Sequence, residues 1–271
     1  PALGRGIGAL RQVVHPDGGI ALMNDSAFGV QCAPAELFAL ANRLGVSHGE
    51  PDPRGSISLP HAGYHGLRSP EGDALIVDAG AIGPDHQPGH GHADFLSFEL
   101  SVAGRRVVVD SGVGSYQDPC WRSYARSTAA HSTVEIGERS QVELWGAFRV
   151  GRRTRPRGVE TSVGADGFRL TAEHDGYVDL PGHPLHRRRF AMRPRREGEG
   201  AMLRVRDEVT VGKTGRGLSA VARVIFAPEL RVEAVAAEAE NLQKGPRTWR
   251  VVPDDPGHAG PTVLAVWEVE G

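Results

Sequence analysis

The sequence predicts a mainly β protein built on a large antiparallel β-sandwich, with a short helical segment at its N-terminus. From about residue 55 onward, several segments alternate polar and apolar residues with period two. Turn-forming residues are frequent, with 36 Gly and 19 Pro among 271 residues, and no helical pattern separates the strand-like segments. Before residue 55, apolar residues instead recur with helical spacing.

Two short helices are expected near the N-terminus. The first covers residues 1–13 and stops at a Pro and two Gly, and the second covers residues 34–44, with Pro first and Gly after its end. Two short helices cannot close a domain. They are either a small decoration or the tail of a larger helical domain, which we favour, and we place the boundary between residues 1–50 and 51–271.

Strand-like segments fill the rest of the chain. In one of them, Arg204 and Arg206 alternate with Leu203 and Val205, as in a strand with one apolar face. Because no helices intervene, an antiparallel sandwich is favoured over a parallel βαβ fold. The predicted strands are Ala74–Val77, Phe95–Val102, Arg105–Val109, Thr133–Ile136, Phe168–Ala172, Met202–Val211 and Val221–Phe226.

Composition excludes some classes of partner. The formal net charge is −2, so no global field would recruit nucleic acid or an anionic membrane. No apolar run is long enough to cross a membrane, and no signal peptide is recognisable. Cys32 and Cys120 make no disulfide framework, and either one bond or two free thiols fits the sequence.

Chemically active side chains concentrate between residues 86 and 132. His90, His92 and Asp94 are spaced by two, so on a strand they would share one face. A His-x-His pair suits zinc and similar ions, although such pairs also occur on surface strands without a metal. Asp110 ends a run of three valines and either meets a polar pocket or caps a turn.

Asp110 can reach His92 only if the strand pairing is irregular. With a tight hairpin at Ala103-Gly104, a regular ladder leaves Asp110 several residues short and on the wrong face, so a bulge or bend is required. Further along, His131 fits a ligand or a hydrogen-bonded structural histidine. The segment between them contains Tyr116, Arg122, Tyr124 and Arg126, which suit either surface turns or a uronic-acid subsite.

Three motifs in this order resemble the signature of heparinase II/III-like proteins, a family that includes alginate and heparan lyases: GHGHADFLSFEL, VVVDSG and RSTAAHSTVEI. HPDGGIALMNDSAFG, HDGY and HRRRF extend the similarity over roughly residues 15–210. The resemblance implies an (α/α) toroid followed by an antiparallel β-sandwich. The N-terminal helices would then be the remnant of that toroid, most of which the chain lacks.

The resemblance also implies roles for individual residues. One zinc ion, mainly structural, would be held by His92, Asp110 and His131. His90 matches the histidine that faces the sugar, and Tyr124 is expected to be catalytic beside it, with Tyr116 as its competitor. Substrate-binding roles are expected for Arg126, Tyr116 and His174. The family often has Asn where this chain has Ser132 after the third ligand.

The activity implied by the resemblance is β-elimination at a uronic acid in an acidic polysaccharide. In the family the main base, the main acid and the residue that neutralises the carboxylate lie in the toroid, so this chain alone is expected to have little or no activity. The missing toroid would be its partner, and the expected compartment is the periplasm or cell envelope. The sequence leaves open which glycan is cleaved, whether cleavage is endo or exo, and whether the chain forms a homodimer.

Three alternatives share the same sequence features. The first is a non-catalytic module that binds an acidic glycan, with a structural metal. The second is a metallohydrolase, for which Asp94 and Glu99 are the nearby bases and only Asp94 shares the face of the ligands. The third is a purely structural metal site. The basic run 152–157 either helps to hold an acidic glycan or is simply solvated.

Overall fold

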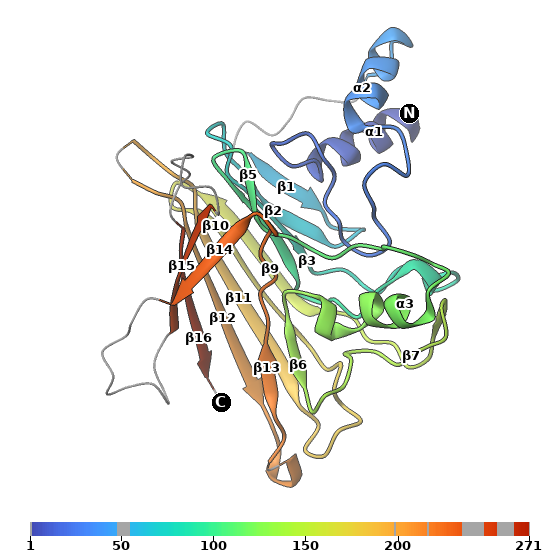
Figure 1. The fold of residues 1–271 in the computed structure, drawn as a ribbon, viewed down its shortest axis with the longest axis vertical. Helices are drawn as coiled ribbons and strands as arrows, with labels where there is room; N and C mark the ends of the chain where they lie inside the picture. The colour runs from blue at the N-terminus through green and yellow to red at the C-terminus, as the bar shows by residue number, and fades with distance from the viewer. Residues whose placement is uncertain are drawn as a thin grey trace.

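The computed structural model describes residues 2–47, 55–197, 199–215, 217–234, 247–253 and 263–270. Helices α1 (Ala2–Gln12) and α2 (Pro34–Arg43) contact each other at one end of the molecule (Figure 1). Gly45 follows α2 with a φ of 63°, the left-handed conformation that ends many helices. Both predicted helices are therefore confirmed. No helix within the described ranges is long and apolar enough to span a membrane.

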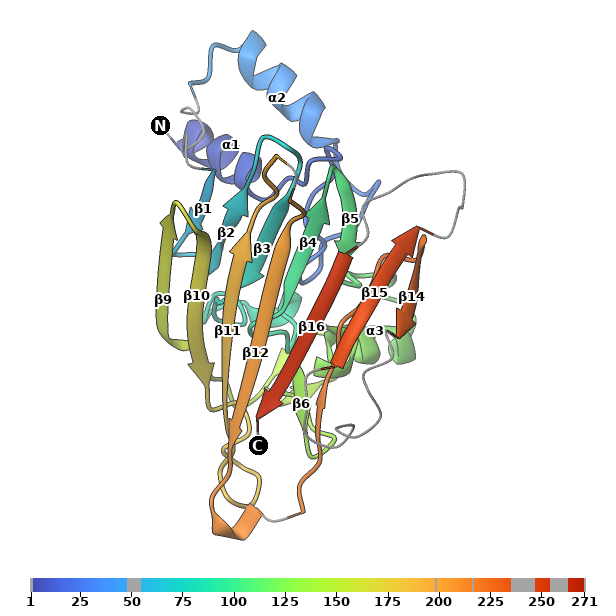
Figure 2. The same cartoon turned by 90° about the vertical axis from the view of Figure 1, so that its left-hand side faces the viewer.

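Two large sheets form the body of the protein (Figures 1 and 2). The first has five strands in chain order: β1 (Ser56–Leu59), β2 (Tyr64–Arg68), β3 (Ala74–Asp78), β4 (Phe98–Val102) and β5 (Arg105–Val108). The second has seven, in the order β14 (Leu230–Ala234), β15 (Arg247–Pro253), β16 (Val263–Glu270), β12 (Met202–Thr210), β11 (Leu185–Arg193), β10 (Gly167–His174) and β9 (Arg157–Gly164). Two small ribbons pair β6 (Val134–Ile136) with β13 (Ala220–Ala222) and β7 (Leu144–Trp145) with β8 (Arg149–Val150).

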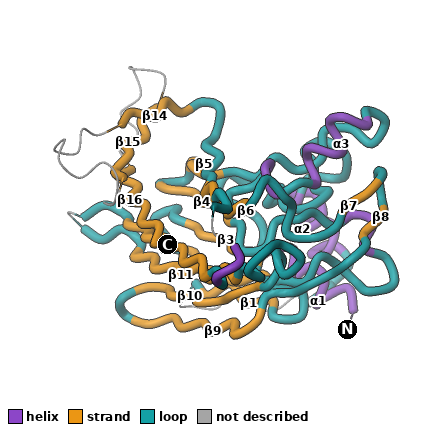
Figure 3. The backbone as a smooth tube through the Cα atoms, turned by 90° about the horizontal axis from the view of Figure 1, so that it is seen from below, coloured by secondary structure: helices purple, strands orange, loops and turns teal. Residues whose placement is uncertain are grey.

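The two large sheets share one hydrophobic core, so the predicted sandwich is confirmed. Leu75 and Phe98 of the first sheet belong to the same buried cluster as Leu170 and Phe190 of the second. The rings of Phe98 and Phe190 meet edge to face, 5.5 Å apart, an arrangement that aromatic pairs favour. Pairing is antiparallel except between β12 and β16, which run parallel. Seen from below, the seven-stranded sheet and the helices lie on opposite sides (Figure 3).

The β4–β5 hairpin contains the irregularity that the sequence required. Ala103 and Gly104 form a tight turn with φ of 52° and 80°. The ladder then slips, because Ser101 pairs with Arg106 whereas Leu100 pairs with Val108. The predicted bulge is confirmed, and it reverses which face of the sheet the residues after it occupy. Asp110 can therefore enter the interior of the protein.

One local prediction was wrong. The strand expected from Phe95 begins only at Phe98, because Leu96 has a φ of 61° and the preceding residues form a turn. His90 thus ends the 3₁₀ turn Pro88–His90 and His92 lies in the loop after it, so neither is on a strand. The segment for which the sequence left surface turns and a uronic-acid subsite open contains helix α3 (Pro119–Arg126). The helix is capped by the Asp118 carboxylate, which accepts hydrogen bonds from two backbone N–H groups.

The segment after α1 packs against the outer face of the first sheet. His15 contacts Glu99 at 2.8 Å, and the backbone N–H of Leu22 donates to the same carboxylate at 2.6 Å. Ala21 and Met23 belong to a small apolar cluster with residues of β1 and β3. Residues 14–25 are therefore packed onto the sandwich, although they precede α2. The predicted domain boundary at residues 50 and 51 lies outside the described residues.

Candidate active site and metal centre

A buried group of potential metal ligands lies at the edge of the core. His92, Asp110 and His131 are exposed by 0%, 4% and 0%, and their ligand atoms all lie within 4.8 Å of one another. His131 Nδ1 is 2.7 Å from Asp110 Oδ2. The bulge in β5 positions Asp110, and the loop after the 3₁₀ turn positions His92. His131 comes from the segment that follows α3. The three residues proposed as ligands are thus brought together from distant parts of the chain.

The donor atoms of this group fit a metal ion. His92 Nδ1 and His131 Nε2 are buried and have no hydrogen-bond partner among the described residues. In each ring the other nitrogen lies beside a carboxylate, so the unpartnered nitrogen is the one that would bind an ion, which would displace any proton it carries. A buried imidazole nitrogen without a partner is costly unless it binds something, and imidazole with carboxylate suits zinc. The group could therefore hold one metal ion.

The surrounding charges also favour a cation. Burial and the nearby Asp110 raise the pKa of Asp78 to about 7, and burial and Asp78 raise the pKa of Asp94 well above its usual value. Burial lowers the pKa of His92 to about 4, which keeps its ring neutral. Burial also opposes charge on His131, but Asp110 outweighs it and raises the pKa to about 9. Several carboxyl groups thus share one buried region, where an ion of positive charge would relieve their repulsion.

Asp25 joins the buried ligand group to the surface. Its Oδ1 is 2.9 Å from His92 Nε2, and its Oδ2 is 2.8 Å from His90 Nδ1. Tyr116 donates its hydroxyl to the same Oδ2 at 3.0 Å. Burial alone would raise the pKa of Asp25, but hydrogen bonds from His92, Arg122 and His90 hold it far below the usual range. Asp25 is therefore an ionised carboxylate that orients two histidines and a tyrosine.

Arg122 supplies the counter-charge for Asp25. Its guanidinium makes a two-pronged ion pair with the carboxylate and is only 1% exposed. The rings of Tyr116 and Phe148 lie 4.9 and 5.1 Å from its central carbon, so the cation also contacts two aromatic rings. Arg122 is therefore unavailable to a ligand and instead fixes this surface.

His90 and Tyr116 form the exposed part of this arrangement. Asp25 accepts a hydrogen bond from His90 Nδ1, which leaves His90 Nε2 as the basic nitrogen on a side chain that is 57% exposed. The Tyr116 hydroxyl lies 3.4 Å from His90 Nδ1, and burial and Asp25 raise the Tyr116 pKa. The pair thus combines an imidazole nitrogen that can accept a proton with a phenol that keeps its proton.

Three expected site residues lie elsewhere. Tyr124 is 46% exposed on α3 and contacts Trp121, with a ring separation of 5.8 Å, rather than His90. Arg126 is buried, and its guanidinium donates to the backbone carbonyls of Gly91 and Gly146. His174 is fully buried. In this geometry neither Arg126 nor His174 can contact a substrate, because both are enclosed by the protein.

His174 instead begins a buried polar chain. The N–H of Gly176 donates to His174 Nδ1, so His174 Nε2 carries the proton that bonds His186 Nδ1 at 3.0 Å. His186 Nε2 then donates to Asp207 at 2.7 Å. Burial lowers the pKa of both histidines, which keeps both rings neutral. The chain ends at the ion pair between Asp207 and Arg188, both 0% exposed.

Arg188 connects the second sheet to the metal-ligand loops. Its guanidinium pairs with Asp207 at 2.6 and 2.8 Å, and it also donates to the carbonyls of Leu96 and Ser132. Ser132 directly follows His131, and Leu96 lies in the turn after Asp94. One buried arginine therefore holds two of the loops that form the ligand group.

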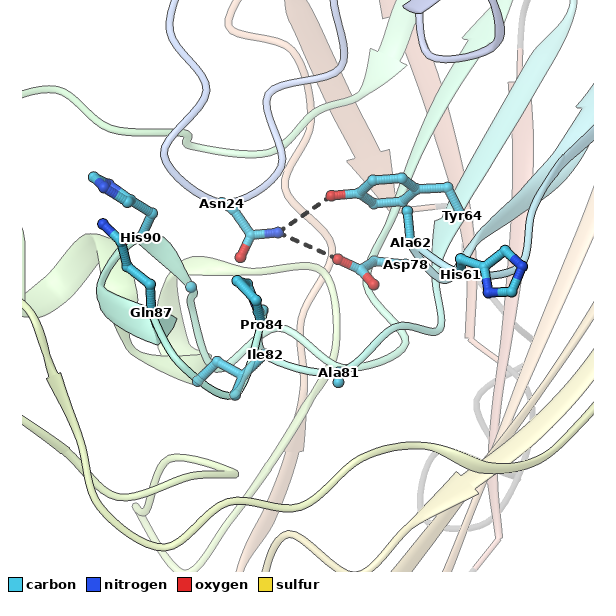
Figure 4. Close-up of a pocket in the computed structure, with 12 residues that line it drawn as sticks. Asn24, His61, Ala62, Tyr64, Asp78, Ala81, Ile82, Pro84, Gln87 and His90 are labelled. Atoms are coloured by element: carbon cyan, nitrogen blue, oxygen red, sulfur yellow. Dashed lines mark hydrogen bonds between the residues drawn. The ribbon is translucent and has the colours of Figure 1, made fainter. Parts of the chain in front are cut away.

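A pocket of about 430 Å³ opens beside His90 (Figure 4). Asn24 crosses it, donating to the Tyr64 hydroxyl at 3.3 Å and to Asp78 at 3.4 Å. The carbonyl oxygen of the same amide accepts the backbone N–H of His92 at 2.9 Å. The pocket is lined by Asn24, His61, Ala62, Tyr64, Asp78, Ala81, Ile82, Gly83, Pro84, Gln87, His90 and Gly91.

Sequence reasoning missed Asn24, Asp25, Asp78, Arg188 and Asp207. The two N-terminal residues reach the site only through tertiary packing, which no local pattern reveals. A signal did exist for Asp207, because it shares strand parity with the apolar Val205, which places it on the inward face of the strand. Arg188 likewise shares strand parity with the inward-facing Phe190 and Met192 of β11.

Comparisons with known proteins give one matching family model and several similar solved structures. Residues 51–264 match the family model described as heparinase II/III-like, C-terminal. A heparan sulfate lyase HepC mutant from Pedobacter heparinus aligns over 96% of this chain and 52% of its own, at 15% identity and a TM-score of 0.49. A heparinase III structure aligns over 98% and 54%, at 14% identity and a TM-score of 0.45. This chain spans about half the length of these enzymes. No curated protein matches it.

Proposed function

The chain belongs to the heparinase II/III-like family, and from that premise we propose that it forms the sandwich wall of an active cleft that cleaves uronic-acid-containing glycans by β-elimination. The observation that carries this proposal is the Asp25-centred arrangement, which holds His90 and Tyr116 side by side at an exposed edge. The helices of residues 1–50 and the sandwich of residues 51–271 would be parts of two domains, a helical toroid and a β-sandwich.

β-Elimination needs a base for the C5 proton and an acid for the departing glycosidic oxygen. The main base and the main acid are expected in the helical domain, so His90 and Tyr116 are proposed to assist them from the sandwich side of the cleft. His90 Nε2, freed by the hydrogen bond of Nδ1 to Asp25, can accept a proton. The Tyr116 phenol keeps its proton because its pKa is raised, so it can give that proton to the leaving oxygen. Among the two tyrosines considered as catalytic partners of His90, the geometry favours Tyr116 over Tyr124.

A zinc ion on His92, Asp110 and His131 would have a structural role. Its positive charge would stabilise the buried carboxyl groups. Because the second ring nitrogen of His92 bonds Asp25, the ion would also fix the position of Asp25. The ligand atoms are fully buried, so the ion would not contact the glycan directly. Loss of the ion is therefore expected to disturb His90 through Asp25 rather than to remove a reactant.

Because half of the cleft would come from the helical domain, we propose that this chain alone has little lyase activity and that the longer enzyme acts in the periplasm or cell envelope. A non-catalytic glycan-binding role is the second candidate. The observation that favours it is the exposed pair Trp121 and Tyr124, 41% and 46% exposed, which resembles an aromatic platform for a sugar face.

The form of the protein that includes the helical domain is expected to release unsaturated uronates from an acidic glycan. β-Elimination creates a C4–C5 double bond conjugated to the carboxylate, so ultraviolet absorbance rises together with reducing ends. Reducing ends without that absorbance would indicate hydrolysis and contradict the proposal. Glycan binding without either product would instead support the binding module.

A further inference from the structure

We propose that Glu99 is a positioning residue of the candidate site: one oxygen of its buried carboxylate holds both the backbone that leads to Asp25 and the backbone of Asp110. This inference rests on the proposed function only in treating Asp25 and Asp110 as parts of one working site. Glu99 itself contacts neither the glycan nor the metal-ligand atoms and acts through the residues that it holds.

Glu99 is buried beneath the N-terminal segment. It lies on β4 between Phe98 and Leu100, whose side chains belong to the core, so its own side chain points to the other face of the sheet. It is nevertheless 0% exposed. Its Oε1 accepts the backbone N–H of Leu22 at 2.6 Å and the backbone N–H of Asp110 at 3.3 Å. One buried oxygen therefore joins two segments that are distant in the sequence.

The same two segments are joined a second time, beyond the site residues. The N–H of Val113 donates to the carbonyl of Ser26 at 3.1 Å. Gly112 has a φ of 56°, and a Cβ atom there would lie 2.3 Å from the Ser26 oxygen, so only glycine allows this approach. Asp25 is therefore held between two points, the Glu99 bond on one side and the Ser26 bond on the other.

The second oxygen of Glu99 keeps the carboxylate in one orientation. Arg106 donates to Oε2 at 3.1 Å, and His15 Nε2 lies 2.8 Å from the same oxygen. The other ring nitrogen of His15 is 2.7 Å from the Ser101 hydroxyl, and Arg106 also pairs with Asp17 of the covering segment. With Oε2 held by these partners, Oε1 stays directed at the two backbone N–H groups.

The position of Asp25 matters for both parts of the site. Its carboxylate is 2.8 Å from His90 Nδ1 and 2.9 Å from His92 Nε2. A displaced Asp25 would no longer select which nitrogen of His90 carries the proton, and a displaced Asp110 would weaken the metal-ligand group. Residues that hold metal ligands in place typically change metal affinity by about 10–100-fold when they are altered.

Two substitutions separate the length of the Glu99 side chain from its charge. Glu99→Asp keeps the charge but shortens the side chain, so that one oxygen no longer reaches both N–H groups. Glu99→Gln removes the charge but keeps the length and a carbonyl oxygen in the place of Oε1. The His15 ring can accept a hydrogen bond from the new amide by carrying its proton on the nitrogen next to Ser101. A positioning role therefore predicts that Glu99→Asp is the defective variant.

The experiment has two readouts on the 271-residue chain. The first is its affinity for zinc, measured by competition with a chelator. The second is the NMR signals of the His90 ring nitrogens in the metal-free chain at about pH 9, where histidine is ordinarily neutral. Glu99→Asp is expected to lower zinc affinity about 10–100-fold and to replace the Nδ1–H form of His90 by a mixture of both ring forms. Glu99→Gln should keep the native signals and stay within about threefold in zinc affinity.

Asp73→Ala is the matched control for a loss of stability. Asp73 is also 0% exposed, and its carboxylate likewise accepts two backbone N–H groups, from Ala103 at 3.0 Å and from Arg195 at 2.8 Å. It precedes β3, whereas Asp78 of the candidate site ends that strand. This variant should unfold more easily than the native chain but keep its zinc affinity and its His90 signals.

The outcomes also separate this inference from the proposed function. Native zinc affinity and native His90 signals in Glu99→Asp would overturn the positioning role, as would a larger defect in Glu99→Gln or an equal one in Asp73→Ala. If the native chain binds no zinc, the His90 signals decide alone. Failure of the proposed function is seen separately, as no release of unsaturated uronate by the form with the helical domain, and would leave the role of Glu99 intact.

Discussion

Replacing Tyr116 by Phe is expected to lower kcat for glycan cleavage by about 10²–10⁴-fold, the usual contribution of a positioned proton donor. The reason is geometric. The Tyr116 hydroxyl is held by Asp25 at 3.0 Å and lies beside His90, whereas Tyr124 points to Trp121 on the exposed side of α3. The measurement is kcat and KM on the form of the protein that includes the helical domain.

Tyr124→Phe is the matched control, because it removes the same hydroxyl from a tyrosine of similar exposure. It is expected to change kcat by less than about twofold, since no proton donor at His90 is lost. A larger loss for Tyr124→Phe than for Tyr116→Phe would contradict the assignment and restore the interpretation favoured by the sequence. Equal KM values for native enzyme and Tyr116→Phe would place the effect on the chemical step.

Asp207→Asn is expected to lower the free energy of unfolding by about 3–5 kcal/mol, because it leaves the Arg188 guanidinium buried without its carboxylate. Both side chains are 0% exposed, and their two hydrogen bonds measure 2.6 and 2.8 Å. Denaturant titration would show a lower midpoint with an unchanged slope. The substitution should also disturb the loops that hold the metal-ligand group, since Arg188 donates hydrogen bonds to the carbonyls of Leu96 and Ser132.

Glu208→Gln provides the comparison, because it neutralises the next residue of β12. Glu208 pairs with Arg189 at 3.3 Å, but both side chains are more than one-third exposed, so a change below about 1 kcal/mol is expected. If both variants lose similar stability, the buried Asp207–Arg188 pair contributes no more to the free energy of unfolding than the exposed Glu208–Arg189 pair.

The Asp207 ion pair also predicts a dependence of stability on pH. Burial raises the pKa of Asp207, but Arg188 and His186 outweigh burial and lower the pKa far below its usual value. The stabilisation is therefore present above about pH 4, the pKa of an unfolded Asp, and is lost as the pH falls below that. In Asp207→Asn, the free energy of unfolding should therefore fall less steeply as the pH is lowered below about 4.

The parts of the fold that the sequence predicted are those set by local patterns. Periodicity and end signals predicted α1 and α2, and period-two alternation predicted the sandwich strands. The bulge before Asp110 was predictable because a regular ladder would have placed that residue on the wrong face. The identity of the three buried residues of the ligand group was also predicted, through the family resemblance, and the structure brings them together.

The parts that could not be predicted depend on contacts between distant segments. Asn24 and Asp25 reach His92 across more than sixty residues, and nothing local marks them as site residues. The choice between Tyr116 and Tyr124 depended on α3, which turns Tyr124 outward. Asp118 followed by Pro119 is a local signal for that helix, as an N-cap and first-turn pair, but the residues alone left surface turns and a uronic-acid subsite open for this segment.

The direct test of the ligand group is the metal content of the purified chain, measured by elemental analysis. One zinc ion per chain is expected in the native protein and in His86→Ala, an exposed histidine outside the group. His92→Ala and His131→Ala should each lose the ion, because a three-residue site cannot spare a ligand. A native chain without metal, or zinc retained by both of these variants, would show that His92, Asp110 and His131 are not a metal site.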